Sequence, residues 1–110
     1  KKISYADIRI ALERVGLDPD LKKHVSKYSM GMRHRLGIAQ AIMEKPKLLI
    51  LDEPMNGLDK QGVAEIRQVL KQLNREGATI ILSSHYAEDI EVLCDTVYEM
   101  DAGVLTFIKR

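Results

Sequence analysis

The sequence lacks the features that would place it among secreted or membrane-spanning proteins. Its single cysteine, Cys94, excludes an intramolecular disulfide and a cysteine-based zinc cluster. A chain without an intramolecular disulfide fits a reducing, cytosolic location. The apolar neighbours of Cys94 favour a role as a small, buried, apolar residue. Apolar runs fall well short of the ~18 residues that cross a bilayer, and the N-terminus shows no signal-peptide hydrophobic region. We therefore expect a chain that is not embedded in a membrane.

Neither sign of charge dominates. Lysine and arginine total 17 residues and aspartate and glutamate 16, for a net charge of +1. Proteins that bind nucleic acid usually carry a basic stripe and a much higher isoelectric point, so we expect no nucleic-acid partner. There is no repeat or low-complexity linker, and 110 residues form one domain at most. The chain begins without methionine, and we expect it to be a piece of something longer.

The periodicity of the apolar residues changes near Pro46. Before it, helical spacing predicts one helix that follows a possible cap at Ser4 and stops near Gly16. A second helix should begin between Met30 and Met32 and end before Pro46. The first part of the chain is therefore predicted to be helical.

After Pro46 the pattern predicts an α/β fold. A continuous apolar run is typical of a strand buried on both faces, and a second such run follows an amphipathic helix that ends near Gly77. Strand, helix and strand in this order predict a right-handed βαβ unit with parallel strands. A further helix and a hairpin should follow. The strands are expected at residues 48–51, 79–82, 96–100 and 104–108, and the last helix at residues 87–93.

Two adjacent carboxylates, Asp52 and Glu53, come directly after the first of these strands. Ligand sites of parallel sheets lie at the carboxyl ends of the strands. A magnesium nucleotide needs one acid near the metal and another group that orients or deprotonates the attacking water, and consecutive residues can divide these roles. By itself this pattern favours the alternative of an acidic loop after a core strand.

Three further stretches accompany these carboxylates in a fixed order. Tyr28-Ser29-Met30-Gly31-Met32 precedes them, and Asn56-Gly57-Leu58-Asp59 and Ser83-Ser84-His85 follow. In order, they and residues 48–54 resemble the signature motif, Walker B motif, D-loop and switch histidine of ATP-binding cassette (ABC) ATPases, the nucleotide-binding domains of ABC transporters. The resemblance implies a partial P-loop NTPase (RecA-like) core with parallel strands and a C-terminal β-hairpin over residues 46–110. Residues 1–45 would end the helical subdomain that carries the signature motif.

The resemblance also implies roles for six residues. Asp52 would hold Mg²⁺, Glu53 would be the general base for the attacking water, and His85 would contact the γ-phosphate of ATP. The nucleotide contacts would come from Ser29 and Gly31, acting on ATP bound to a partner domain, and from Asp59. A hydroxyl, a close glycine backbone and the amides of a helix N-terminus do form an anion site, although Ser29 can also simply cap the helix.

This sequence departs from the family's commonest pattern. Met30 and Met32 replace a glycine and a glutamine of the signature motif, which restricts backbone approach and removes a hydrogen-bonding side chain. Arg33, His34 and Arg35 come next; they could reach phosphate or ribose, although a solvated helix face is the alternative we favour.

No Gly-x-x-x-x-Gly-Lys-Ser/Thr (Walker A) loop occurs in the sequence to cradle the phosphates of ATP. We therefore expect these 110 residues alone to be inactive and to bind ATP weakly. The strands that would accompany a Walker A loop would be missing too. Their absence would leave sheet edges unpaired and core faces uncovered.

The function that this resemblance implies is ATP hydrolysis coupled to transport across a membrane, with export of a drug, an antimicrobial peptide or a lipid as the closest match. The expected partners are a second ABC ATPase domain and a transmembrane permease, at the cytoplasmic face of the membrane. Two alternatives stay open: a soluble ABC ATPase that acts on ribosomes or DNA, and a non-catalytic module that supplies only the signature motif to a partner.

Overall fold

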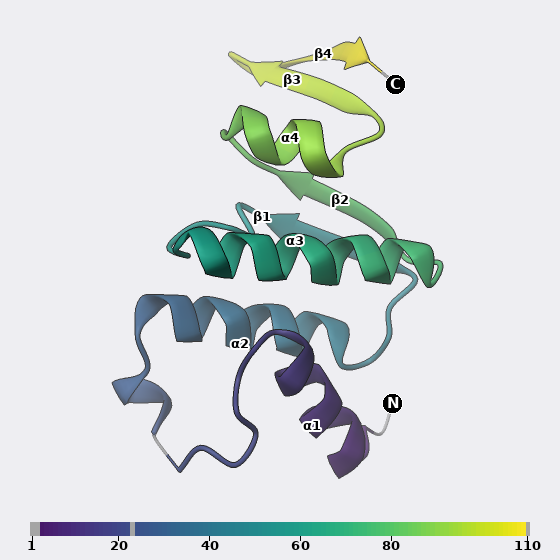
Figure 1. Cartoon of the computed structure of the whole chain (residues 1–110). Helices are drawn as coiled ribbons and strands as arrows, with labels where there is room; N and C mark the ends of the chain where they lie inside the picture. Colours follow the sequence, from purple (N-terminus) through teal and green to yellow (C-terminus); the bar gives the residue numbers. More distant parts are fainter. Residues whose placement is uncertain (1–2, 23, 110) are drawn as a thin grey trace.

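The computed structural model describes residues 3–22 and 24–109. Figure 1 shows α3 lying between α2 and the parallel strands β1 and β2, with α4 and the β3–β4 hairpin beyond them. In chain order the elements are α1 (Tyr5–Arg14), the 3-10 helix η1 (Val25–Lys27), α2 (Met30–Ile42), β1 (Leu48–Asp52), α3 (Lys60–Arg75), β2 (Thr79–Ser83), α4 (Ala87–Leu93), β3 (Val97–Asp101) and β4 (Val104–Lys109).

Helix α1 begins and ends where its sequence predicts. The Ser4 hydroxyl accepts a hydrogen bond from the Asp7 amide at 3.0 Å, and the Asp7 carboxylate accepts one from the Ser4 amide at 3.4 Å. This reciprocal capping box satisfies amides that have no partner inside the helix. Gly16, at φ +82°, adopts the left-handed conformation that glycine tolerates best and turns the chain away from the helix.

The predicted βαβ unit is present, with β1 and β2 parallel. Their register pairs Leu48 with Thr79 at one end and Asp52 with Ser83 at the other. Both strands therefore deliver their C-terminal residues to the same edge of the sheet. In Figure 1 this edge and the N-termini of α2 and α3 lie on the left side of the molecule.

Only one face of the β1–β2 sheet is covered, so the expectation that these strands are buried on both faces is wrong for this chain. Leu49 points toward α3 and is 4% exposed, whereas Ile50 and Ile81, paired on the opposite face, are 69% and 55% exposed. Successive side chains of a strand point to opposite faces, so one helical layer covers only alternate residues. The expectation of an uncovered core face is confirmed.

Helix α3 forms the centre of the apolar core. Its buried positions, Gly62, Ile66, Leu70 and Leu73, recur every three to four residues and form one stripe. Ile66 is fully buried and Leu70 is 2% exposed. The core residues that join them come from α1 and the loop after it, α2, β1 and the turn that follows β1: Ala11, Val15, Leu17, Ile38, Ala39, Ile42, Leu49 and Met55.

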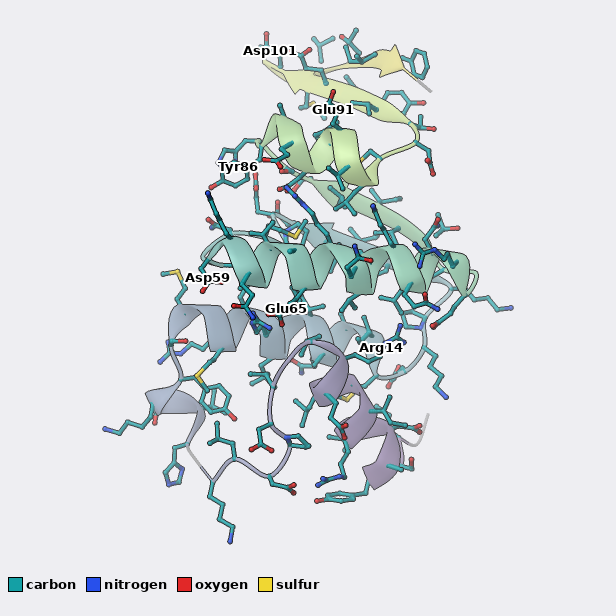
Figure 2. The ribbon with its side chains drawn as sticks, viewed as in Figure 1. Arg14, Asp59, Glu65, Tyr86, Glu91 and Asp101 are labelled. Carbon is teal, nitrogen blue, oxygen red and sulfur yellow. The ribbon has the colours of Figure 1, made fainter. Side chains whose placement is uncertain are left out.

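The C-terminal part also follows the sequence, with one correction. Strands β3 and β4 are antiparallel and joined at the Asp101–Val104 pair, with Asp101 labelled in Figure 2. The turn residues Ala102 and Gly103 both have positive φ, at 49° and 79°. Two consecutive positive φ angles match the type I′ hairpin turn. Cys94, expected to be buried, is only half-buried, because it lies just beyond the end of α4. Among the described residues, no helix has both the length and the apolar character needed to cross a membrane.

Candidate functional site

Three of the predicted site residues lie together at the C-terminal edge of the β1–β2 sheet. Asp52 ends β1, and its carboxylate accepts a hydrogen bond from the hydroxyl of Ser83, which ends β2. Glu53 Oε1 lies 2.7 Å from Nδ1 of His85, which stands two residues beyond β2. The parallel register therefore brings Asp52, Glu53 and His85 into one cluster, which we call the acidic edge together with Ser83.

The backbone at Glu53 is held in an uncommon conformation. Its φ is +49°, in the left-handed region that costs a residue with a side chain about 1–2 kcal/mol. The Glu53 amide donates to the carbonyl oxygen of Ser83 at 3.0 Å and also approaches its hydroxyl at 3.2 Å. These bonds continue the ladder by one residue and turn the carboxylate toward His85. Strained residues held by their surroundings cluster at functional sites.

The acidic edge is open enough to receive a ligand and is chemically suited to a bound nucleotide. The side chains of Glu53 and His85 are 29% and 65% exposed. Nδ1–H of His85 donates to the Glu53 carboxylate, and in a protonated imidazole Nε2 remains as a second N–H donor that can reach a ligand. Beside them, Asp52 offers carboxylate oxygens, the ligand type that Mg²⁺ prefers. The acidic edge therefore offers a carboxylate for a metal, a second carboxylate as proton acceptor and an imidazole that can donate to a phosphate, side by side.

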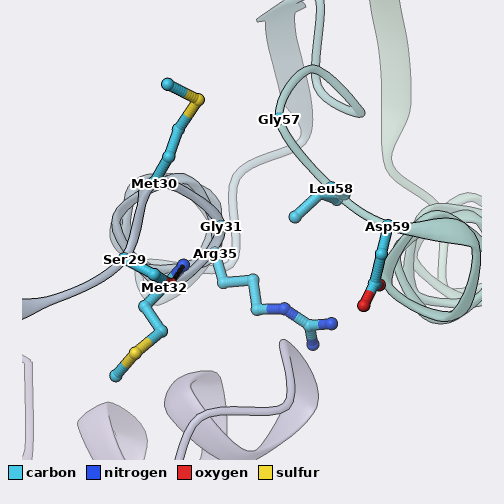
Figure 3. A pocket seen from close by; sticks show the side chains of 8 residues that line it. All are labelled: Ser29, Met30, Gly31, Met32, Arg35, Gly57, Leu58 and Asp59. Atoms are coloured by element: carbon cyan, nitrogen blue, oxygen red, sulfur yellow. Dashed lines mark hydrogen bonds between the residues drawn. The ribbon is translucent and has the colours of Figure 1, made fainter.

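The other three predicted site residues, Ser29, Gly31 and Asp59, line a hollow of about 400 Å³ between the start of α2 and the turn before α3. The Ser29 hydroxyl accepts the Met32 amide at 3.1 Å, and the Asp59 carboxylate accepts the Gly62 amide at 2.7 Å. Ser29 is therefore the N-cap of α2, and Asp59 is the N-cap of α3. Figure 3 shows the full lining: Ser29, Met30, Gly31, Met32, Arg35, Gly57, Leu58 and Asp59.

The signature and D-loop stretches touch each other across this hollow. A Cβ added at Gly57 would lie 2.8 Å from Sδ of Met30, and one at Gly31 would lie 3.6 Å from the carbonyl oxygen of Gly57. Gly57 also has φ +81°. The left-handed backbone favours glycine at position 57, whereas the neighbouring Met30 is a flexible side chain.

The basic residues after the signature stretch do not share one solvated face. Arg33 is exposed and donates to the Ser26 carbonyl at 3.1 Å, which agrees with the favoured alternative. His34 and Arg35 do not: both are half-buried. Nε2 of His34 donates to the carbonyl of Pro54, directly after Glu53. The expectation is wrong for these two residues because their partners lie on distant segments.

Arg35 joins three segments of the chain. Its Nη1 donates to the carbonyl oxygen of Val15 at 2.8 Å and to Oε2 of Glu65 at 3.0 Å. Figure 3 shows the guanidinium reaching from α2 toward Asp59, in the space beneath the D-loop turn. The end of α1, the start of α2 and helix α3 are thereby tied together beside the hollow.

Ser83 and a buried pair, Arg67 and Asp89, contribute to the site region although they were not among the predicted site residues. Asp89 is 2% exposed and accepts hydrogen bonds from Nε and Nη2 of Arg67 at 3.2 and 2.6 Å. The only signal for the pair was the position of Arg67 beside Ile66 of the core stripe. That signal is weak, because long basic side chains often flank a core while their charge reaches solvent.

Comparisons with known proteins agree on one family. The profile described as ABC transporter matches residues 3–56. The uncharacterized ABC transporter ATP-binding protein YybJ of Bacillus subtilis is 52% identical over 106 residues, 96% of this chain and 49% of the relative. The bacitracin transport ATP-binding protein BcrA of Enterococcus faecalis is 50% identical over 104 residues, 94% of this chain and 34% of the relative.

A third relative extends the comparison. The lantibiotic transport ATP-binding protein SrtF of Streptococcus pyogenes is 44% identical over 108 residues, 98% of this chain and 47% of the relative. The chain therefore spans about half or less of the length of these relatives.

Proposed function

Because this chain belongs to the ABC transporter ATP-binding family, we propose that it is part of a subunit that hydrolyses ATP to drive transport across a membrane. The observation that carries the proposal is the acidic edge, where parallel strands place Asp52, Glu53 and His85 together. Residues 46–110 belong to the RecA-like catalytic core in this proposal. Residues 1–45 belong to the helical subdomain that carries the signature motif.

Glu53 acts as the general base for the attacking water. Its carboxylate is partly exposed, so a water can reach it, and the contact at 2.7 Å with Nδ1 of His85 fixes its direction. His85 in its protonated form donates Nε2–H to the γ-phosphate, because its Nδ1–H is turned toward Glu53. Positioning the water and stabilising the phosphate charge are the main contributions that a protein makes to phosphoryl transfer.

Asp52 is the residue that fits Mg²⁺. It lies at the sheet edge, is exposed, and has its orientation fixed by the Ser83 hydroxyl. Magnesium bound with a nucleotide usually takes one or two protein carboxylates, with phosphate oxygens and waters completing the shell. When bound, the metal neutralises the charge that develops on the phosphates.

Ser29, Gly31 and Asp59 act at the interface with a second ABC ATPase domain. Ser29 and Gly31 contact the γ-phosphate of ATP held by that domain, and the D-loop turn with Asp59 lies beside them. The support is the shared hollow, in which an exposed hydroxyl and a glycine open the N-terminal end of α2. The amides of a helix N-terminus favour an anion at this place.

The transport substrate is an antimicrobial peptide or a related compound. The supporting observation is that two of the relatives are named for transport of bacitracin and of a lantibiotic, at 50% and 44% identity. The remaining partner is a transmembrane permease, which places the whole protein at the cytoplasmic face of the membrane. A Walker A loop elsewhere in the whole protein completes the site, and the 110 residues alone do not turn over ATP.

ATP hydrolysis by the purified whole protein tests this function, with and without magnesium. We expect MgATP turnover that stops when EDTA removes the metal and returns when Mg²⁺ is added. The isolated 110 residues should show no turnover, and calorimetry should detect no micromolar binding of MgATP. Absence of turnover by the whole protein with its permease would contradict the proposal, and tight binding by the isolated residues would contradict the need for a Walker A loop.

A further inference from the structure

A buried ionic network supports the loop that carries His85. Asp89, in the first turn of α4, is the one charged residue among the buried side chains of the described segments. Its Oδ1 accepts two hydrogen bonds from Arg67 of α3, whose side chain is only 17% exposed. A carboxylate is buried at tolerable cost only when it is paired and its oxygens are satisfied.

The second oxygen of Asp89 holds the loop itself. The hydroxyl of Ser84 donates to Asp89 Oδ2 at 3.1 Å and at the same time accepts the amide of Tyr86 at 3.1 Å. These two residues flank His85 in the chain. Asp89 therefore anchors both sides of His85 through one hydroxyl, while Arg67 anchors Asp89 to the helix at the centre of the core.

The loop that these hydrogen bonds hold carries His85 to the acidic edge. His85 lies 65% exposed on a segment between β2 and α4, and its only side-chain hydrogen bond in the described structure is the one to Glu53. A solvent-exposed imidazole on an unanchored loop would sample many orientations. A fixed loop removes most of that freedom before the ligand arrives, which is how preorganised sites keep their geometry.

We propose that Asp89 is a positioning residue that, together with Arg67 and Ser84, keeps His85 oriented against Glu53. This inference rests on the proposed function only for its effect on ATP turnover. The orientation of His85 is a property of the protein without ligand. The two consequences can therefore be measured separately.

The test uses the whole protein with Asp89→Asn, which keeps the shape of the side chain and removes its charge. Nitrogen NMR of histidine-labelled protein should show the Nδ1 signal of His85 moving toward the value found in Glu53→Gln. The kcat for ATP should fall about 10- to 100-fold, the range expected for a displaced reacting group, while KM changes less than about threefold.

Glu88→Gln is the matched control. Glu88 also contacts Arg67, at 3.6 Å, and neighbours Asp89 in α4, but it is 77% exposed. We expect this variant to leave the His85 signal and kcat unchanged, because exposed ion pairs contribute little. If Asp89→Asn prevents folding, Ser84→Ala replaces it, because that change removes only the hydroxyl that links Asp89 to the loop.

The outcomes separate the two claims. A moved His85 signal with an intact melting temperature supports the positioning role, even if the whole protein shows no ATP turnover and the proposed function fails. An unchanged His85 signal in a folded Asp89→Asn or Ser84→Ala variant overturns the positioning role. In an active protein, an unchanged kcat overturns it as well.

Discussion

Substituting Gly57 with alanine separates backbone strain from side-chain contact in the D-loop turn. Gly57 has φ +81°, and a left-handed conformation costs a residue with a Cβ about 1–2 kcal/mol. The new methyl group would also lie 2.8 Å from Sδ of Met30. Met30 is 71% exposed, and its flexible side chain can rotate away at little cost. The total destabilisation should therefore stay near the backbone cost alone.

Gly103→Ala provides the comparison, because Gly103 has φ +79° and no heavy atom lies within 4 Å of the added Cβ. We expect thermal melting of the whole protein to show equal losses for the two variants, within about 0.5 kcal/mol, because both carry the same left-handed strain. Of the two variants, Gly57→Ala alone should lower ATP turnover, because it displaces Met30 from the hollow. A loss for Gly57→Ala more than about 2 kcal/mol greater than for Gly103→Ala would refute the reasoning, because Met30 would then be rigidly packed.

Two further changes test the long-range contacts. Arg35→Ala should destabilise the protein by about 2–3 kcal/mol, because it leaves the Val15 carbonyl without its charged donor. The control Arg33→Ala should cost less than about 0.5 kcal/mol. Equal effects of the two changes in thermal melting would contradict this. The hydrogen bond from Arg9 lowers the pKa of Asp20 below its ordinary value of 3.8. This carboxylate therefore stabilises the folded state above that value and loses its contribution as the pH falls through the lowered pKa. The difference in melting temperature between wild type and Asp20→Asn should shrink over that acid range, and a difference independent of pH would contradict it.

Local signals in the sequence predicted most of the elements. The Ser4 cap, the left-handed glycine after α1 and the stripe of α3 depend on residues three or four positions apart, so each can be recognised without knowing the fold. The same holds for the hairpin at Ala102 and Gly103, where two positive φ angles require small turn residues.

Features that depend on distant partners were harder to predict. An all-apolar strand such as β1 gives no sign of which face is covered, so the exposure of Ile50 could not be read from its neighbours. Arg35 and Asp89 are ordinary charged helix residues in sequence, and only the packing of α1 and α3 against them explains their burial. The acidic edge was predictable because parallel strands deliver Asp52 and His85 to one end of the sheet.

The measurement that most directly tests the central claim is MgATP turnover and binding by the whole protein with Glu53→Gln. The amide keeps the size of the side chain but cannot accept a proton from the attacking water. If the acidic edge is the hydrolytic site, turnover should fall about 100- to 10,000-fold, the usual contribution of a general base, while ATP affinity stays within a few fold. Turnover close to that of the wild type would contradict the assignment of Glu53 and the account of the site built on it.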